Sequence, residues 1–170
     1  MSRSGYRQAL RPILRHAEWV TLVDPFLSPG KDEKWPILEI CASLLPAVGK
    51  GPGSGLITVH STMGDYKGTS SSLLDHWGKL LAALSGQPGS HRPFRVVLWK
   101  KRSRGGPRFH DRALFTNQCG VDVPGGFDCW DETKNTTRWH LIDHRALWEC
   151  DVEFDRRYTP HEWINECPFP

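Results

Sequence analysis

The residues best suited to chemistry lie near the middle of the chain, in the segment Arg108-Phe-His-Asp-Arg-Ala-Leu-Phe-Thr-Asn117. His110 and Arg112 are two positions apart. Successive side chains of a β-strand point to opposite faces, so on a strand these two would share one face. An imidazole beside a permanent, fork-shaped guanidinium cation suits a phosphate group. The segment therefore predicts a phosphate site that contains His110 and Arg112.

A run of basic residues leads into this pair. Six basic residues and no acidic one lie between positions 95 and 108: Arg95, Lys100, Lys101, Arg102, Arg104 and Arg108. The chain of 170 residues has 22 basic and 19 acidic residues and a formal charge of +3, so without this run it would carry −3. Such concentrated charge predicts one anion-binding edge. A solvated loop is the alternative interpretation, because the run has the composition of a turn.

Hydrophobic periodicity predicts the elements that would position the pair. We expect a leading helix and then alternating strands and helices: helix 6–17, strand 18–24, a helix that begins at Pro36, strand 56–60, a helix capped by Ser72 and Asp75, and strand 94–99. This order predicts parallel strands joined by right-handed crossovers.

After Gly106 the pattern changes to strands separated by turns, over 108–117, 136–143 and 148–155, and we expect the last dozen residues to wrap the surface. The prediction is thus an α/β fold, with a mixed β-sheet flanked by helices and a mainly antiparallel second half.

The length and composition are those of one globular domain, and we expect residues 1–170 to form it. No apolar run approaches the ~20 residues of a membrane helix. The N-terminus lacks the apolar stretch of a secretory signal, so a cytoplasmic location is expected. Five cysteines without a C-x-x-C pair fit reduced thiols better than a disulfide framework.

The spacing of His110, Arg112 and Asn117 resembles the H-x-K-x(4)-D signature of the phospholipase D superfamily, with Arg112 in the Lys position and Asn117 in the Asp position. A closer resemblance is to the phospholipase-D-like C-terminal domain of MIT-domain proteins and its prokaryotic relatives. In that group an H-D-R core precedes a Gly-rich turn that ends in Asp. The matching segments here are His110-Asp111-Arg112, Gly120, Gly125-Gly126-Phe127-Asp128 and the earlier strand end Val23-Asp24-Pro25-Phe26. The similarity covers residues 18 to 155.

The resemblance implies a mixed sheet with His110 on a central strand. In active members two motifs meet: one His attacks phosphorus to form a phosphohistidine and the other protonates the leaving oxygen, with no metal or cofactor. Since this chain has one motif, an active form would be a homodimer that brings two His110 side chains together. The candidate catalytic residues are His110, Arg112 and Asn117. The candidate phosphate- or nucleic-acid-binding residues are Lys100, Lys101, Arg102, Arg104, Arg108, Gly125, Gly126 and Asp128.

Two functions stay open at this point. Arg112 can hold a phosphate as well as Lys, but Asn117 replaces a carboxylate and the usual Gly-Ser-x-Asn continuation is absent. The chain is either a metal-independent nuclease or phosphodiesterase, or a catalytically degenerate module that binds nucleic acid, anionic lipid headgroups or a protein partner. Nucleic acid is the preferred partner, because the dense basic loop has no amphipathic membrane helix beside it. Family members often follow another domain, so the chain is consistent with a piece of a longer protein that acts with a further domain or partner.

Other groups of residues are weaker candidates for a functional site. A zinc site from Cys119, Cys129, His140 and His144 is disfavoured, because nine residues separate the cysteines and histidines at i and i+4 on a strand lie about 13 Å apart. A serine hydrolase built on His60, Ser61 and Asp65 lacks a G-x-S-x-G elbow. The glycine-rich segment 49–55 follows a helix instead of preceding one, so it is not a phosphate loop. Among the tryptophans we expect Trp19, Trp77 and Trp99 to pack in the core, and Trp130 and Trp139 to lie near ligand.

Overall fold

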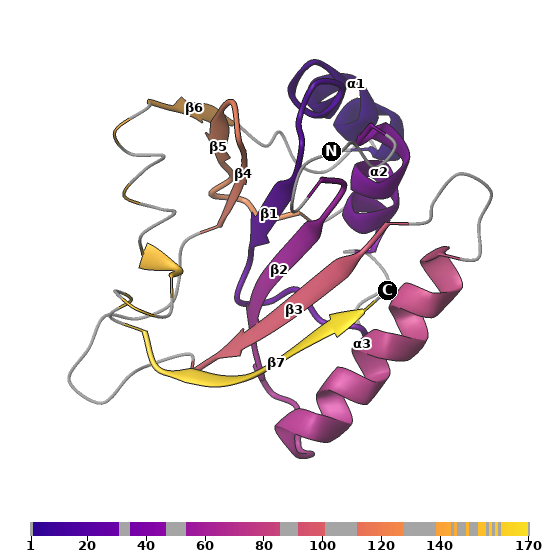
Figure 1. Cartoon of the computed structure of the whole chain (residues 1–170), viewed down its shortest axis with the longest axis vertical. Helices are drawn as coiled ribbons and strands as arrows, with labels where there is room; N and C mark the ends of the chain where they lie inside the picture. Colours follow the sequence, from indigo (N-terminus) through magenta and orange to yellow (C-terminus); the bar gives the residue numbers. More distant parts are fainter. Residues whose placement is uncertain are drawn as a thin grey trace.

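The computed structural model describes residues 2–30, 35–46, 54–85, 92–100, 112–127, 139–143, 145, 149, 153–155, 157, 159 and 161–169. The helices within these ranges are α1 (Arg3–Leu14), α2 (Pro36–Leu44) and α3 (Ser70–Ser85). The strands are β1 (Val20–Val23), β2 (Ile57–Thr62), β3 (Phe94–Trp99), β4 (Ala113–Thr116), β5 (Gly120–Asp122), β6 (His140–Ile142) and β7 (Trp163–Phe169). They form one sheet in the order β6-β5-β4-β1-β2-β3-β7 (Figure 1).

The centre of the sheet is parallel and its flanks are antiparallel. Strand β2 pairs in parallel with both β1 and β3, whereas β4, β5, β6 and β7 pair antiparallel. The predicted α/β class, with its β-α-β-α-β start and antiparallel second half, is confirmed. The carboxyl ends of β1, β2 and β3 meet the first residues of β4 and β7 at one border of the sheet, because Val23 is paired with Ala113 and Trp99 with Trp163. We call this border the carboxyl edge.

The two faces of the sheet have different coverings. Side chains such as Leu22, Val59 and Val96 belong to the main core, together with buried residues of all three helices. The neighbouring Val23 and Val97 point the other way, into a second cluster with Trp99, Ala113, Phe115 and Phe154. Helices therefore cover one face, and part of the C-terminal segment covers the other (Figure 1).

The expected helices form, but α1 and α3 begin earlier than predicted, and α1 ends at Leu14 instead of residue 17. Helix α1 begins at Arg3 rather than at residue 6, because the Ser2 hydroxyl accepts a hydrogen bond from Gly5 N and caps the helix. Helix α3 begins at Ser70, and its cap is Thr69 and not Ser72: Thr69 Oγ1 accepts from Ser72 N at 3.2 Å. Helix α2 begins at Pro36 as expected, since proline has no N–H to lose in the first turn.

The C-terminal residues do not simply wrap the surface. Residues Trp163–Phe169 form β7, which pairs with β3 along its length. The prolines of this segment argued against a strand, but β7 lies at the border of the sheet, where a missing N–H can face solvent. Strand β5 was also not expected; it pairs with β4 through the register Leu114↔Val121.

The expected strand over 148–155 is wrong at the positions that the structure describes. Glu149 and Glu153 are helical, and Phe154 and Asp155 lie in a turn and a bend. Arg145 and Glu149 form an i,i+4 ion pair at 3.1 Å, as on a helix. The alternating apolar and polar residues that suggested a strand include Phe154. Its ring is buried, and its centroid lies 5.0 Å from that of His60.

Candidate functional site

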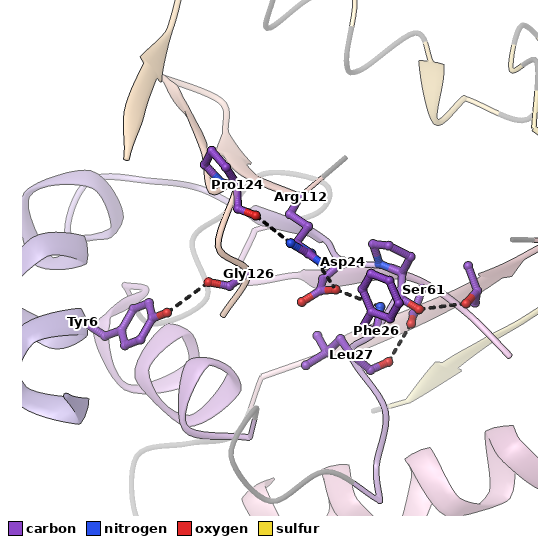
Figure 2. A network of polar contacts seen from close by, with 10 residues as sticks. Tyr6, Asp24, Phe26, Leu27, Ser61, Arg112, Pro124 and Gly126 are labelled. Carbon is purple, nitrogen blue, oxygen red and sulfur yellow. Dashed lines mark hydrogen bonds and ion pairs between the residues drawn. The ribbon is translucent and has the colours of Figure 1, made fainter. Parts of the chain in front are cut away.

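Arg112 and Asp24 meet at the carboxyl edge. Asp24 follows the last residue of β1 and Arg112 precedes the first residue of β4. The antiparallel pairing of β1 with β4 brings these two residues side by side. Arg112 Nε lies 3.7 Å from Asp24 Oδ1, and the Asp24 carboxylate is fully buried (Figure 2). The guanidinium thus provides positive charge for a carboxylate that is removed from water.

The loop after β1 is fixed to β2 beneath the guanidinium. Asp24 Oδ1 accepts the N–H of Phe26 at 2.8 Å, and the Phe26 ring lies under the guanidinium with its centroid 4.8 Å from the carbon Cζ. The hydroxyls of Thr62 and Ser61 donate to the carbonyls of Pro25 and Leu27 at 2.7 and 2.6 Å. Since Phe26 is anchored through this loop, its ring holds Arg112 in place by a cation–π contact (Figure 2).

A glycine turn closes over the other side of Arg112. Arg112 Nη1 donates to the carbonyl of Pro124 at 2.6 Å, and Gly126 N donates to Val123 O at 2.8 Å to close the turn. The Gly126 carbonyl accepts the Tyr6 hydroxyl of α1 at 3.1 Å. Gly126 has φ +75°, and a Cβ at this position would lie 3.3 Å from Arg112 Cδ. Only glycine fits this turn without strain or displacement of the arginine.

Part of the Arg112 guanidinium is left for a ligand. A guanidinium has five N–H donors in a fixed fork. Among the described residues, Pro124 O accepts one of them, while the buried Nε has no hydrogen-bond partner and faces Asp24 from beyond hydrogen-bond distance. The side chain is 21% exposed. The arrangement can therefore accept an anion such as phosphate on the open side of the fork.

The structure also places three other predicted site residues. Lys100 follows β3 at the carboxyl edge, and its ammonium group forms an ion pair with Glu162. Gly125 is exposed in the same turn as Gly126. Asn117 lies beyond the opposite end of β4, where its Oδ1 accepts from Glu18 N at 2.9 Å. The four residues of β4 separate it from Arg112, so five steps along the strand place the two about 16 Å apart and they are not brought together.

The remaining predicted site residues lie outside the described part of the chain. They are His110, Lys101, Arg102, Arg104, Arg108 and Asp128. Their roles stay predictions. Trp130, Cys129 and His144 also lie outside it, and no group of three or more potential metal ligands occurs among the residues that the structure does describe.

A small cavity at the carboxyl edge was not anticipated from the sequence. Its volume is about 190 Å³, and it lies between the loops that follow β1 and β2, next to the Phe26 ring. Its lining includes Pro25, Phe26, Thr62, Gly64 and Tyr66. Ligands of parallel sheets commonly bind outside the carboxyl ends of the strands, which is the position of this cavity. The sequence signal was the pair of strand ends at which these loops begin, Asp24-Pro25-Phe26 and Thr62-Met63-Gly64.

His60 and Ser61 have structural roles. His60 Nδ1 accepts the indole N–H of Trp99 at 2.9 Å. Burial, and secondarily the charge of Arg95, lower the pKa of His60 to about 3, so its ring is uncharged near neutral pH. The Ser61 hydroxyl is buried and bonded to Leu27 O. Hydrolase chemistry is therefore not built around this pair.

The tryptophans that were expected in the core pack there. Trp77 and Trp99 are buried in the two clusters, and Trp19 packs half-buried against the second one. Trp139 is half-buried, with its ring centroid 5.3 Å from that of Tyr6, which itself bonds to the Gly126 turn. Within the described ranges no helix is both long and apolar enough to cross a membrane.

Gly126→Ala should destabilise the fold by about 1 to 2 kcal/mol, because an L-residue is strained at positive φ and its Cβ would press on Arg112. The measurement is urea unfolding followed by circular dichroism. Gly125→Ala is the matched control: it lies in the same turn, is exposed and has no positive φ. Equal losses of stability in the two variants would contradict the requirement for glycine at position 126.

No protein-family model matches the chain, and a search of curated proteins finds no match. Among solved structures, the chain has a weak similarity to TrmBL2, described as an archaeal chromatin protein whose structure shows a novel mode of DNA binding. The identity is 11% and the TM-score 0.40, and the alignment covers 96% of this chain and 52% of that one. This chain thus spans about half the length of TrmBL2.

Proposed function

We propose that this chain is a phospholipase-D-like domain that binds nucleic-acid phosphates at the carboxyl edge, with Arg112 as the central contact. One observation carries the proposal. Three segments that are far apart in the sequence, Asp24-Pro25-Phe26, Arg112 and Gly125-Gly126, meet around one guanidinium. These are the segments through which the sequence resembles the phospholipase-D-like group, so their meeting supports a shared site.

The geometry of Arg112 favours a ligand beyond Asp24. An arginine that served only to neutralise Asp24 would be expected to pair with it through short hydrogen bonds, but Nε and Oδ1 are 3.7 Å apart and the side chain is partly exposed. The Phe26 ring and Pro124 O already fix the side chain. Because it is ordered in advance, little side-chain entropy is lost when an anion binds.

The position of the basic run favours a polyanion. Lys101, Arg102, Arg104 and Arg108 stand in the sequence between Lys100 and Arg112, and both of these flanking residues lie at the carboxyl edge. Several cations near one phosphate site suit a ligand with a phosphate in every unit. Nucleic acid meets this description, and binding would be strongly salt-dependent.

Binding and cleavage can be tested together. The protein is incubated in EDTA with single- and double-stranded DNA and RNA, and separately with anionic vesicles, beside His110→Ala and a variant with Lys101, Arg102 and Arg104 changed to Gln. We expect salt-sensitive binding whose logarithmic salt slope falls by about 0.9 for each lost contact with a duplex phosphate. Cleavage that resists EDTA and disappears in His110→Ala would extend the proposal to a homodimeric, metal-independent nuclease. Unchanged affinity in the neutralised variant, or binding only to anionic vesicles, would overturn it.

A further inference from the structure

Helix α1 carries a row of arginines on its outer side. Arg3, Arg7, Arg11 and Arg15 recur every four residues, so they lie one above another on the helix surface, about 6 Å apart. Arg3 is neutralised by an ion pair with Glu39 of α2. Arg7, Arg11 and Arg15 are exposed, and their side chains have no hydrogen bond or ion pair within the part of the chain that the structure describes. Three neighbouring cations are therefore left without a counter-charge there.

These three arginines line a groove between α1 and α2. The groove has a volume of about 660 Å³, and its polar lining is Ser4, Arg7, Gln8, Arg11, Arg15 and Ser43. Among the described residues, no acidic side chain lines it. Serine and glutamine side chains, like arginine, are common hydrogen-bond donors to phosphate oxygens. The lining thus combines charge and hydrogen bonding suited to a chain of phosphates.

We infer that this groove is a second binding surface for the nucleic-acid backbone, distinct from the site at Arg112. The inference shares its class of ligand with the proposed function. Tyr6, the residue before Arg7, donates its hydroxyl to Gly126 O in the turn over Arg112. The row of arginines therefore starts near the carboxyl edge and leads away from it, toward Arg15. A nucleic acid bound at Arg112 can continue along α1 in contact with the row.

The lining argues against a peptide helix or a membrane as the occupant. Peptide helices bind in grooves through several apolar anchors, but within the described part of the chain the only apolar lining residues are Pro12 and Leu44. Membrane-surface helices insert large apolar side chains. In the described ranges the exposed large apolar side chains are Leu141 and Trp163, and neither belongs to α1 or α2.

The test compares two double variants that remove the same charge. Arg7→Gln/Arg11→Gln alters the groove, whereas Lys79→Gln/Arg145→Gln alters exposed cations on α3 and after β6. Affinity for a labelled DNA duplex is measured by fluorescence anisotropy over a range of salt concentrations. For the groove variant we expect about a tenfold loss of affinity at low salt and a salt slope lower by about 2. The control should change far less. Equal changes in both variants, or none in either, would overturn the inference.

Two further comparisons distinguish this surface from the site at Arg112 and nucleic acid from other anionic ligands. If the groove variant loses affinity while Arg112→Met does not, the groove stands and the proposed function fails; the reverse result supports the proposed function and overturns the groove. Polyglutamate and vesicles with anionic lipid are titrated in parallel. Loss of binding to either probe with DNA binding unchanged would assign the groove to another ligand and overturn the inference. Circular dichroism of both double variants confirms that α1 is intact.

Discussion

Arg112→Met is expected to destabilise the fold by about 3 kcal/mol and to weaken nucleic-acid binding at least tenfold. The stability loss arises because Asp24 is fully buried and loses a nearby positive charge, and removal of one partner of a buried ion pair is strongly destabilising. The affinity loss arises because hydrogen bonds to charged groups contribute about 1.5 to 3 kcal/mol each. Urea unfolding and fluorescence anisotropy with labelled DNA measure the two effects.

A second substitution separates the two roles of Arg112. In Asp24→Asn/Arg112→Met no charge remains at the pair, and Asn Oδ1 can still accept the Phe26 N–H. We expect most of the lost stability to return while the affinity for DNA stays low. If affinity returned together with stability, Arg112 would serve only to neutralise Asp24, and the phosphate contact would be wrong.

The stability of the protein should fall as the pH decreases below about 6.5, because of His60. The pKa of His60 is about 3 in the folded protein and about 6.5 in an unfolded chain. Between these values the unfolded state binds a proton that the folded state does not, so acidification favours unfolding. The loss is at most about 1.4 kcal/mol per pH unit, or about 2 kcal/mol from pH 6.5 to pH 5. Urea unfolding at a series of pH values measures it.

His60→Asn is the matched variant for this effect. Asn Oδ1 can take the place of Nδ1 as acceptor for the Trp99 indole N–H, and it does not titrate. The pH dependence between 6.5 and 5 should therefore flatten. Asp155, whose pKa is lowered to about 2 by hydrogen bonds from Arg157, loses its contribution only at lower pH, between about 3.8 and 2. An unchanged slope in His60→Asn between pH 6.5 and 5 would show that another group is responsible.

The parallel core of the fold could be predicted from local sequence. Short apolar, β-branched runs such as Val20–Val23 and Phe94–Trp99 alternate with helical periods, and prolines and glycines mark their ends. The predicted elements were wrong where long-range strand pairing and packing outweigh local composition. The edge strand β7 contains Pro168, and the strand pattern around Phe154 reflects one buried ring instead of a ladder.

The candidate site was predictable in its parts but not in its assembly. Arg112, Gly126 and Asp24 each stand out in the sequence, yet only the pairing of Val23 with Ala113 brings two of them together. Because β4 runs away from the carboxyl edge, Asn117 lies beyond its far end. The arginines of α1 recur every four residues in the sequence, but their groove depends on how α2 packs beside α1. Periodicity alone contains no information on such contacts.

The most direct test of the central claim is the side-chain N–H signal of Arg112 Nε in a proton–nitrogen NMR spectrum, recorded while a short DNA oligonucleotide is added. The buried position of Nε should make this signal observable, and its absence in Arg112→Lys identifies it. We predict that this signal shifts as DNA is added, that the shift saturates, and that its midpoint equals that of the anisotropy titration. A signal that stays unchanged while DNA binds elsewhere on the protein would contradict the account.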